Sequence, residues 1–71
     1  MPSTKAHFST AIGLRLQALD FDFMDCIAFR DAIHNSFTTD IVRKINVELG
    51  QAKTNQEARA VLNKNGFEII D

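Results

Sequence analysis

The chain has 71 residues and a formal net charge of −1, and 45% of its residues are hydrophobic while 24% are charged. This length excludes a second hydrophobic core, and the composition is that of a globular rather than a disordered protein. The near-neutral charge excludes a strong attraction of the whole surface for nucleic acid or anionic lipid, so any basic surface must be local.

Residues 8–19 fit two kinds of secondary structure. Ile12, Leu14 and Leu16 alternate with other residue types, as in a half-buried strand. A helix also fits, because apolar residues recur at helical spacing: Phe8, Ala11, Ile12, Leu16 and Leu19. We favour the helix, since the only strand that could pair with residues 11–18 is the short segment 67–70. The helix must then accept Gly13 in its interior and Arg15 near the middle of its apolar face.

A second helix is predicted over residues 23–36. Asp22 stands where it can cap the first turn, and Asp25 lies in that turn, where a negative charge interacts favourably with the helix dipole. The apolar stripe of this helix comprises Cys26, Phe29, Ile33 and Phe37.

A third helix is predicted over residues 40–49. Thr39 or Asp40 can cap its beginning, and Gly50 is expected to end it. Its apolar face comprises Ile41, Val42, Ile45 and Leu49. Val47 falls on the opposite face, where it is either exposed or covered by another surface.

The last helix, over residues 55–65, has the clearest end signals. Thr54 and Glu57 are spaced as a capping box, and Gly66 is typical of the residue that follows a helix. Ala58, Val61 and Leu62 share one face at helical spacing.

The predicted fold is therefore all-α, a single domain over residues 1–71 with about four short helices packed antiparallel. The alternative is an α+β fold in which residues 11–18 and 67–70 are paired strands. The expected core of the helical fold comprises Phe8, Phe23, Phe29, Ile33, Phe37, Ile45, Leu49, Val61 and Leu62.

Histidine, cysteine and aspartate offer weak candidates for chemistry. His7 and His34 belong to no metal-binding motif, and a metal-dependent hydrolase using them with Asp25 would require the amino terminus to meet the second helix. We instead expect His7 to be solvated and His34 to pack beside Phe23 and Ile27. Cys26, the only cysteine, is expected to be a buried reduced thiol, which favours a cytoplasmic protein without disulfides.

The two carboxy-terminal helices together suggest a helix-turn-helix, which would make the protein a DNA-binding regulator. Any helical hairpin would show the same pattern. The side chains that would contact DNA are Arg43, Lys44, Lys53, Gln56 and Arg59.

An interaction module fits the sequence best. The chain has no phosphate-binding loop or nucleophile elbow, and a domain of this size seldom forms a ligand pocket of roughly 300 Å³, so we expect neither an enzyme nor a cofactor or metal. Large apolar side chains are left off the predicted stripes, and four short helices do not readily hide them. We therefore expect a protein partner or a second copy to bind a surface comprising Leu14, Phe21, Val47 and Ile70. We expect no association with a membrane.

Overall fold

A computed structural model describes residues 4–67 and 69 of the protein. These residues form four α-helices: α1 (Thr4–Ala18), α2 (Phe23–Ser36), α3 (Thr39–Gln51) and α4 (Asn55–Lys64). The all-α prediction is confirmed. The strand alternative is wrong, because residues 11–18 lie within α1 and residues 67 and 69 form no strand. Residues 68 and 70 of that proposed pair lie outside the described part of the chain.

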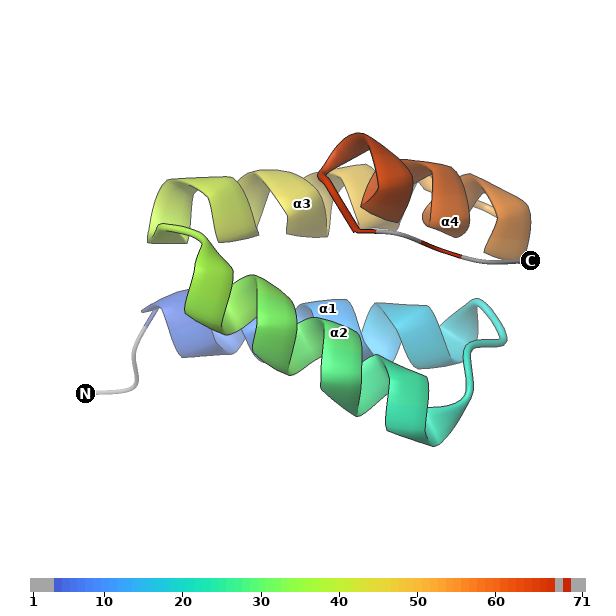
Figure 1. Cartoon of the computed structure of the whole chain (residues 1–71), viewed down its shortest axis with the longest axis horizontal. Coiled ribbons are helices and arrows are strands. Elements are labelled where there is room, and N and C mark those ends of the chain that lie inside the picture. The colour runs from blue at the N-terminus through green and yellow to red at the C-terminus, as the bar shows by residue number, and fades with distance from the viewer. Residues whose placement is uncertain (1–3, 68, 70–71) are drawn as a thin grey trace.

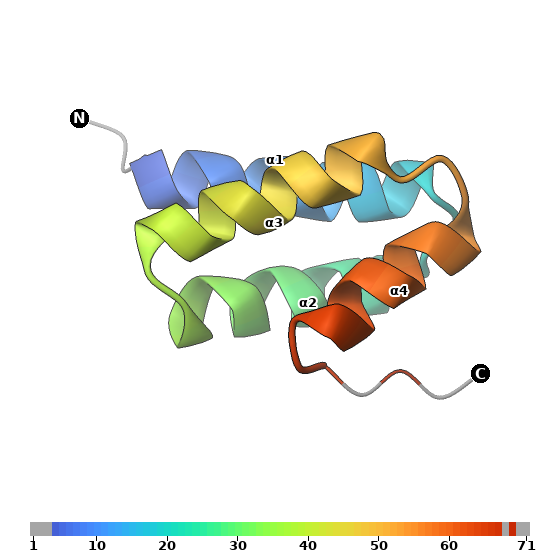
Figure 2. The same ribbon diagram turned by 90° about the horizontal axis from the view of Figure 1, so that it is seen from above.

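The helices form two antiparallel pairs stacked on each other. Figure 1 shows α1 beside α2 in one layer and α3 beside α4 in the other. In Figure 2, seen from above, α3 lies over α1 and α4 over α2. Helix α1 packs closely against both α2 and α3, so it is the central element of the core. The side chains that are fully buried are Ile12, Leu16, Ile33, Val42, Ile45, Leu49 and Leu62.

The predicted core was wrong at one position. Phe23 is 61% exposed, whereas Phe21, which we had expected at an interaction surface, is buried. The turn before α2 explains why Phe21 is buried and Phe23 is exposed. It directs Phe21 inward, where the Phe21 N–H bonds the Leu16 carbonyl and the ring packs edge-on against Phe29. Phe23 then opens α2 on the side that faces away from the core.

This turn is a Schellman motif with an aspartate in the place that glycine usually takes. The Asp20 N–H bonds the Gln17 carbonyl, and the Phe21 N–H bonds the Leu16 carbonyl. Asp20 has a φ of 70°, in the left-handed region. An L-residue other than glycine adopts this conformation at a cost of about 1 kcal/mol.

We expect Asp20→Gly to raise the free energy of unfolding by about 0.5 kcal/mol, because glycine adopts this φ without strain and the change removes a carboxylate from the negative end of the α1 dipole. The greater freedom of glycine in the unfolded chain offsets part of the gain. Urea unfolding followed by circular dichroism measures the change. Asp20→Asn, which removes only the charge, separates the two causes, and a less stable glycine variant would contradict the interpretation.

The carboxyl end of α3 differs from the prediction. Gly50 does not end the helix, which continues to Gln51 with Ala52 as its C-cap. Arg15 of α1 explains this, since its Nε donates to the Leu49 carbonyl over 3.1 Å and its Nη2 to the Ala52 carbonyl over 2.6 Å. A cation from another helix thus satisfies the last carbonyls of α3, and no left-handed glycine is required.

Helix α4 begins and ends largely as its sequence predicts. Thr54 is the N-cap, and its hydroxyl accepts from the Glu57 N–H over 3.1 Å. The Glu57 carboxylate accepts from the N–H of Lys53, one residue earlier than in the standard capping box. The helix ends at Lys64, one residue before the predicted end, and Gly66 follows with a φ of 97°.

Four phenylalanine rings close the side of the molecule where α2 meets the carboxy-terminal segment. Phe67 packs edge-on against Phe29 and Phe37, with centroids 6.1 and 5.9 Å apart, and Phe29 packs in the same way against Phe21. Helices α2 and α4 lack the extensive close backbone packing that α1 makes with α2. The rings therefore join the two layers at this side.

Glu48 on α3 joins that helix to the end of α4. Lys64 Nζ donates to one carboxylate oxygen of Glu48, and Asn65 Nδ2 donates to the other. The hydrogen bond from Lys64 lowers the pKa of Glu48 below its ordinary value, although burial acts in the opposite direction.

We expect the stabilisation from this pair to depend on pH. The unfolded chain binds a proton at Glu48 near the ordinary pKa of about 4.3, whereas the folded protein does so at a lower pH. The contribution is therefore full above about pH 5 and is lost as the pH falls through the lowered folded pKa. Because the Lys64 side chain is 64% exposed, solvent limits the contribution to about 1 kcal/mol or less.

Urea unfolding of the wild type and Glu48→Gln at pH 7 and pH 3 tests this expectation. The wild type should exceed the variant in stability at pH 7, and the difference should be smaller at pH 3. Asp40→Asn is the control, because Asp40 and its partner Arg43 are both largely exposed. A difference that is the same at both pH values would show that the charge of Glu48 is not responsible.

Candidate functional site

A groove lies along the seam of α1 and α2, and we call it the α1–α2 groove. It consists of two hollows that meet at Thr10 and Arg30, one of about 80 Å³ and one of about 190 Å³. The smaller hollow is mainly apolar, whereas most of the residues that line the larger one are polar or charged. Both are smaller than the roughly 300 Å³ of typical small-molecule sites, so the groove suits the side chains of a macromolecule better than a small ligand.

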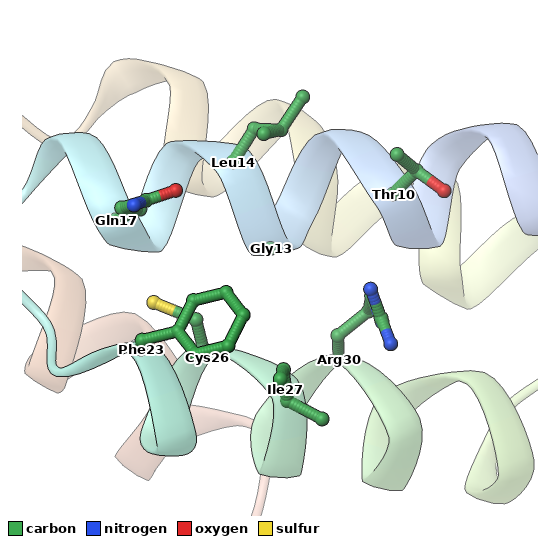
Figure 3. A pocket seen from close by; sticks show the side chains of 8 residues that line it. All are labelled: Thr10, Gly13, Leu14, Gln17, Phe23, Cys26, Ile27 and Arg30. Atoms are coloured by element: carbon green, nitrogen blue, oxygen red, sulfur yellow. The ribbon is translucent and has the colours of Figure 1, made fainter.

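The apolar half lies nearer the turn between the two helices. Figure 3 shows Phe23 and Ile27 on α2 and Leu14 on the neighbouring helix α1, with the Leu14 side chain directed away from α2. Leu14 is 63% exposed and Phe23 61%, and Met24, next to Phe23, is 68% exposed. The residues that line this half are Thr10, Gly13, Leu14, Gln17, Phe23, Cys26, Ile27 and Arg30.

Gly13 allows the two helices to approach closely at the floor of the groove. A Cβ atom at this position would lie 3.3 Å from Cδ of Arg30, which is a tight contact. The apolar stem of Arg30 packs over Gly13, and Figure 3 shows this side chain extending from α2 toward α1. A glycine inside a helix, unfavourable by about 1 kcal/mol, thus has a packing role here.

The polar half contains a buried hydroxyl and a histidine. Ser9 Oγ lies 2.8 Å from His34 Nδ1 and donates to the Lys5 carbonyl over 2.9 Å. The hydroxyl has one proton to donate, so which group donates in the contact between Ser9 and His34 depends on the tautomer of the imidazole. In the same hollow, Arg30 pairs with Asp31 over 3.4 Å. The expectation that His34 packs beside apolar residues therefore missed its polar partner.

Cys26 lies under the apolar half and is 4% exposed, which confirms the expected buried thiol. Its Sγ donates a weak hydrogen bond to the Phe21 carbonyl over 3.7 Å. Burial raises the pKa of the Cys26 thiol, and the charges of Asp25 and Asp22 raise it further. The neutral thiol is a poor nucleophile, so Cys26 contributes packing rather than reactivity.

The four residues predicted for the interaction surface do not form one patch. Leu14 lies on the lip of the α1–α2 groove, whereas Val47 is exposed on α3 and Phe21 is in the core. Ile70 lies outside the described residues. Sequence reasoning missed Phe23 and Met24, because both fall on a helix whose other large apolar residues are buried or half-buried.

The candidate DNA-contacting residues differ in their surroundings. Arg43, Lys44, Lys53 and Gln56 are exposed, but Arg59 is half-buried over the Phe21 ring and donates to Asn55. Helices α3 and α4 run antiparallel in both Figure 1 and Figure 2. This arrangement is a helical hairpin, whereas the helices of a helix-turn-helix meet at about 90–120°. DNA binding stays a prediction.

Geometric support for a metal site is absent from the part of the chain that the structure describes. No three side chains of histidine, cysteine, aspartate or glutamate gather closely enough there to hold an ion. His7 is exposed and packs edge-on against Phe8, while His34 is engaged with Ser9. The metal-dependent hydrolase therefore has no assembled ligand set among these residues.

No helix within residues 4–67 has the length and apolar character required to cross a membrane. Comparison of the chain with models of protein families, with curated proteins and with solved structures gave no match.

Proposed function

We propose that the protein is a small helical interaction module that docks the apolar half of the α1–α2 groove on a protein partner. The observation that carries this proposal is the exposure of Leu14 and Phe23 at one end of the same groove, with the exposed Met24 next to Phe23 in the chain. Elsewhere in the described residues, Ile41 and Val47 are the large apolar side chains that remain exposed, and both are on α3.

Energetics support docking at this groove. Burial of a large apolar side chain contributes about 1.5–3 kcal/mol, so Leu14 and Phe23 together supply a substantial driving force for association. The hydroxyl of Thr10, the amide of Gln17 and the guanidinium of Arg30 border the apolar half. An apolar centre with a polar rim is typical of protein interfaces. A cytoplasmic setting is part of the proposal, because the one cysteine is unpaired.

Site-specific photo-crosslinking in the native cell tests the proposal. A benzophenone side chain at position 14 should produce adducts of discrete mass, and Phe23→Ser should abolish them. The matched control carries the same group at Val47, which is 54% exposed on α3 and should produce no such adducts. Equal adducts from both positions, or adducts that survive Phe23→Ser, would overturn the proposal.

A further inference from the structure

We propose that the occupant of the α1–α2 groove is a second copy of this chain, related to the first by a two-fold axis that passes near Leu14 and Ile27. The inference rests on the proposed function and identifies its partner. In such an interface the same patch is present on both chains, and groups at equal distances on opposite sides of the axis meet.

The spacing along α2 makes the groove self-complementary. Phe23 precedes Ile27 by four residues, or about 6 Å of helix, and Arg30 follows it by three residues, or about 4.5 Å. Rotation about the axis therefore brings Phe23 of one chain near Arg30 of the other. An aromatic ring attracts a guanidinium group that lies over its face, and the two-fold symmetry makes this contact twice.

The charges at the two ends of the groove also favour this arrangement. At the turn between the helices, Asp20 and Asp22 are exposed carboxylates. The opposite end contains Arg30 and His34, together with Asp31, which pairs with Arg30. A two-fold copy places the carboxylates of one chain toward the guanidinium and imidazole of the other, whereas two chains aligned in the same direction would place Asp20 and Asp22 against each other.

The size of this face predicts a weak dimer. Fifteen residues of α1 extend about 22 Å, and two packed helices are about 20 Å wide. Such a face covers about 440 Å², roughly half of the 800 Å² per partner that a specific interface of standard size buries. We therefore expect a dissociation constant in the range of about 1–100 μM.

Sedimentation velocity of the full chain from about 1 μM to 1 mM tests the proposal. The sedimentation coefficient should rise from that of a monomer to that of a dimer of twice the 8.0 kDa chain mass. Leu14→Glu should raise the dissociation constant at least about tenfold, because it places a carboxylate at the centre of the interface. Val47→Glu is the matched control and should leave association unchanged. Because both side chains are more than half exposed, circular dichroism should show both variants folded.

A charge exchange tests the two-fold geometry directly. Asp22→Lys and Arg30→Glu should each weaken self-association, since each puts like charges together at both ends of the interface. An equimolar mixture of the two variants should associate more strongly than either alone, because every altered contact is then between opposite charges.

Several results would overturn the second copy as partner. These are a monomer at every concentration, equal effects of Leu14→Glu and Val47→Glu, and a mixture that associates no better than its components. A monomer whose position-14 crosslinks still depend on Phe23 and contain a different protein would exclude the dimer while leaving the proposed function intact. Loss of those crosslinks as well would end both proposals.

Discussion

Replacing Arg15 by methionine should lower the free energy of unfolding by about 2–3 kcal/mol. The methionine retains most of the apolar stem but leaves the carbonyls of Leu49 and Ala52 without the guanidinium that bonds them. Loss of hydrogen bonds from a charged donor to partly buried acceptors has an effect of this size. The whole chain is expected to have only about 4–10 kcal/mol of stability, so the loss is a large fraction.

Urea unfolding followed by circular dichroism measures this effect. Arg43→Met is the matched control, because Arg43 is exposed on α3 and pairs only loosely with Asp40, and it should change stability by less than about 0.5 kcal/mol. Arg15→Lys should recover part of the loss, since an ammonium group can donate to one of these carbonyls. Equal stability of Arg15→Met and the wild type would show that water replaces the guanidinium without cost.

Replacing Phe67 by alanine should lower the free energy of unfolding by about 2–3 kcal/mol. Phe67 is half-buried and packs edge-on against Phe29 and Phe37, so its removal loses apolar burial and two aromatic contacts. The effect should be below the 3–5 kcal/mol of a fully buried phenylalanine, because one side of the ring is accessible.

Thermal and urea unfolding of the variant test this expectation, and Phe67→Leu separates the two causes. Leucine keeps much of the apolar area but loses the edge-on geometry, so its loss should be about 0.5–1.5 kcal/mol. If both variants were as stable as the wild type, neither the area nor the geometry of the ring would matter, and the carboxy-terminal segment would not join the two layers.

Much of the secondary structure could be predicted because its signals are local. The observed α2 has the predicted bounds of residues 23–36, and the caps at Thr54 and Gly66 are where the sequence indicates. Each of these features depends on residues within one or two turns of helix. The misplaced end near Gly50 depends on Arg15, which is 35 positions away in the chain.

Less of the candidate site could be predicted. Leu14 was identified, because it falls off the apolar stripe of its own helix. Phe23 and Phe21 exchanged places relative to expectation, since they lie on either side of a turn whose left-handed residue is an aspartate rather than a glycine. The contact between Ser9 and His34 joins two helices, and no periodic pattern in the sequence of either helix indicates it.

The sequence by itself determined that this protein is helical and where three of its helices lie, because hydrogen bonds and apolar spacing within a helix involve neighbours only. The tertiary structure alone decided which apolar residues remain in solvent and which polar groups satisfy one another. Those outcomes depend on how α1 packs against α2 and α3, and the chain direction after each turn sets that packing. The groove, the Arg15 contacts with α3 and the aromatic contacts of Phe67 all arise at this level.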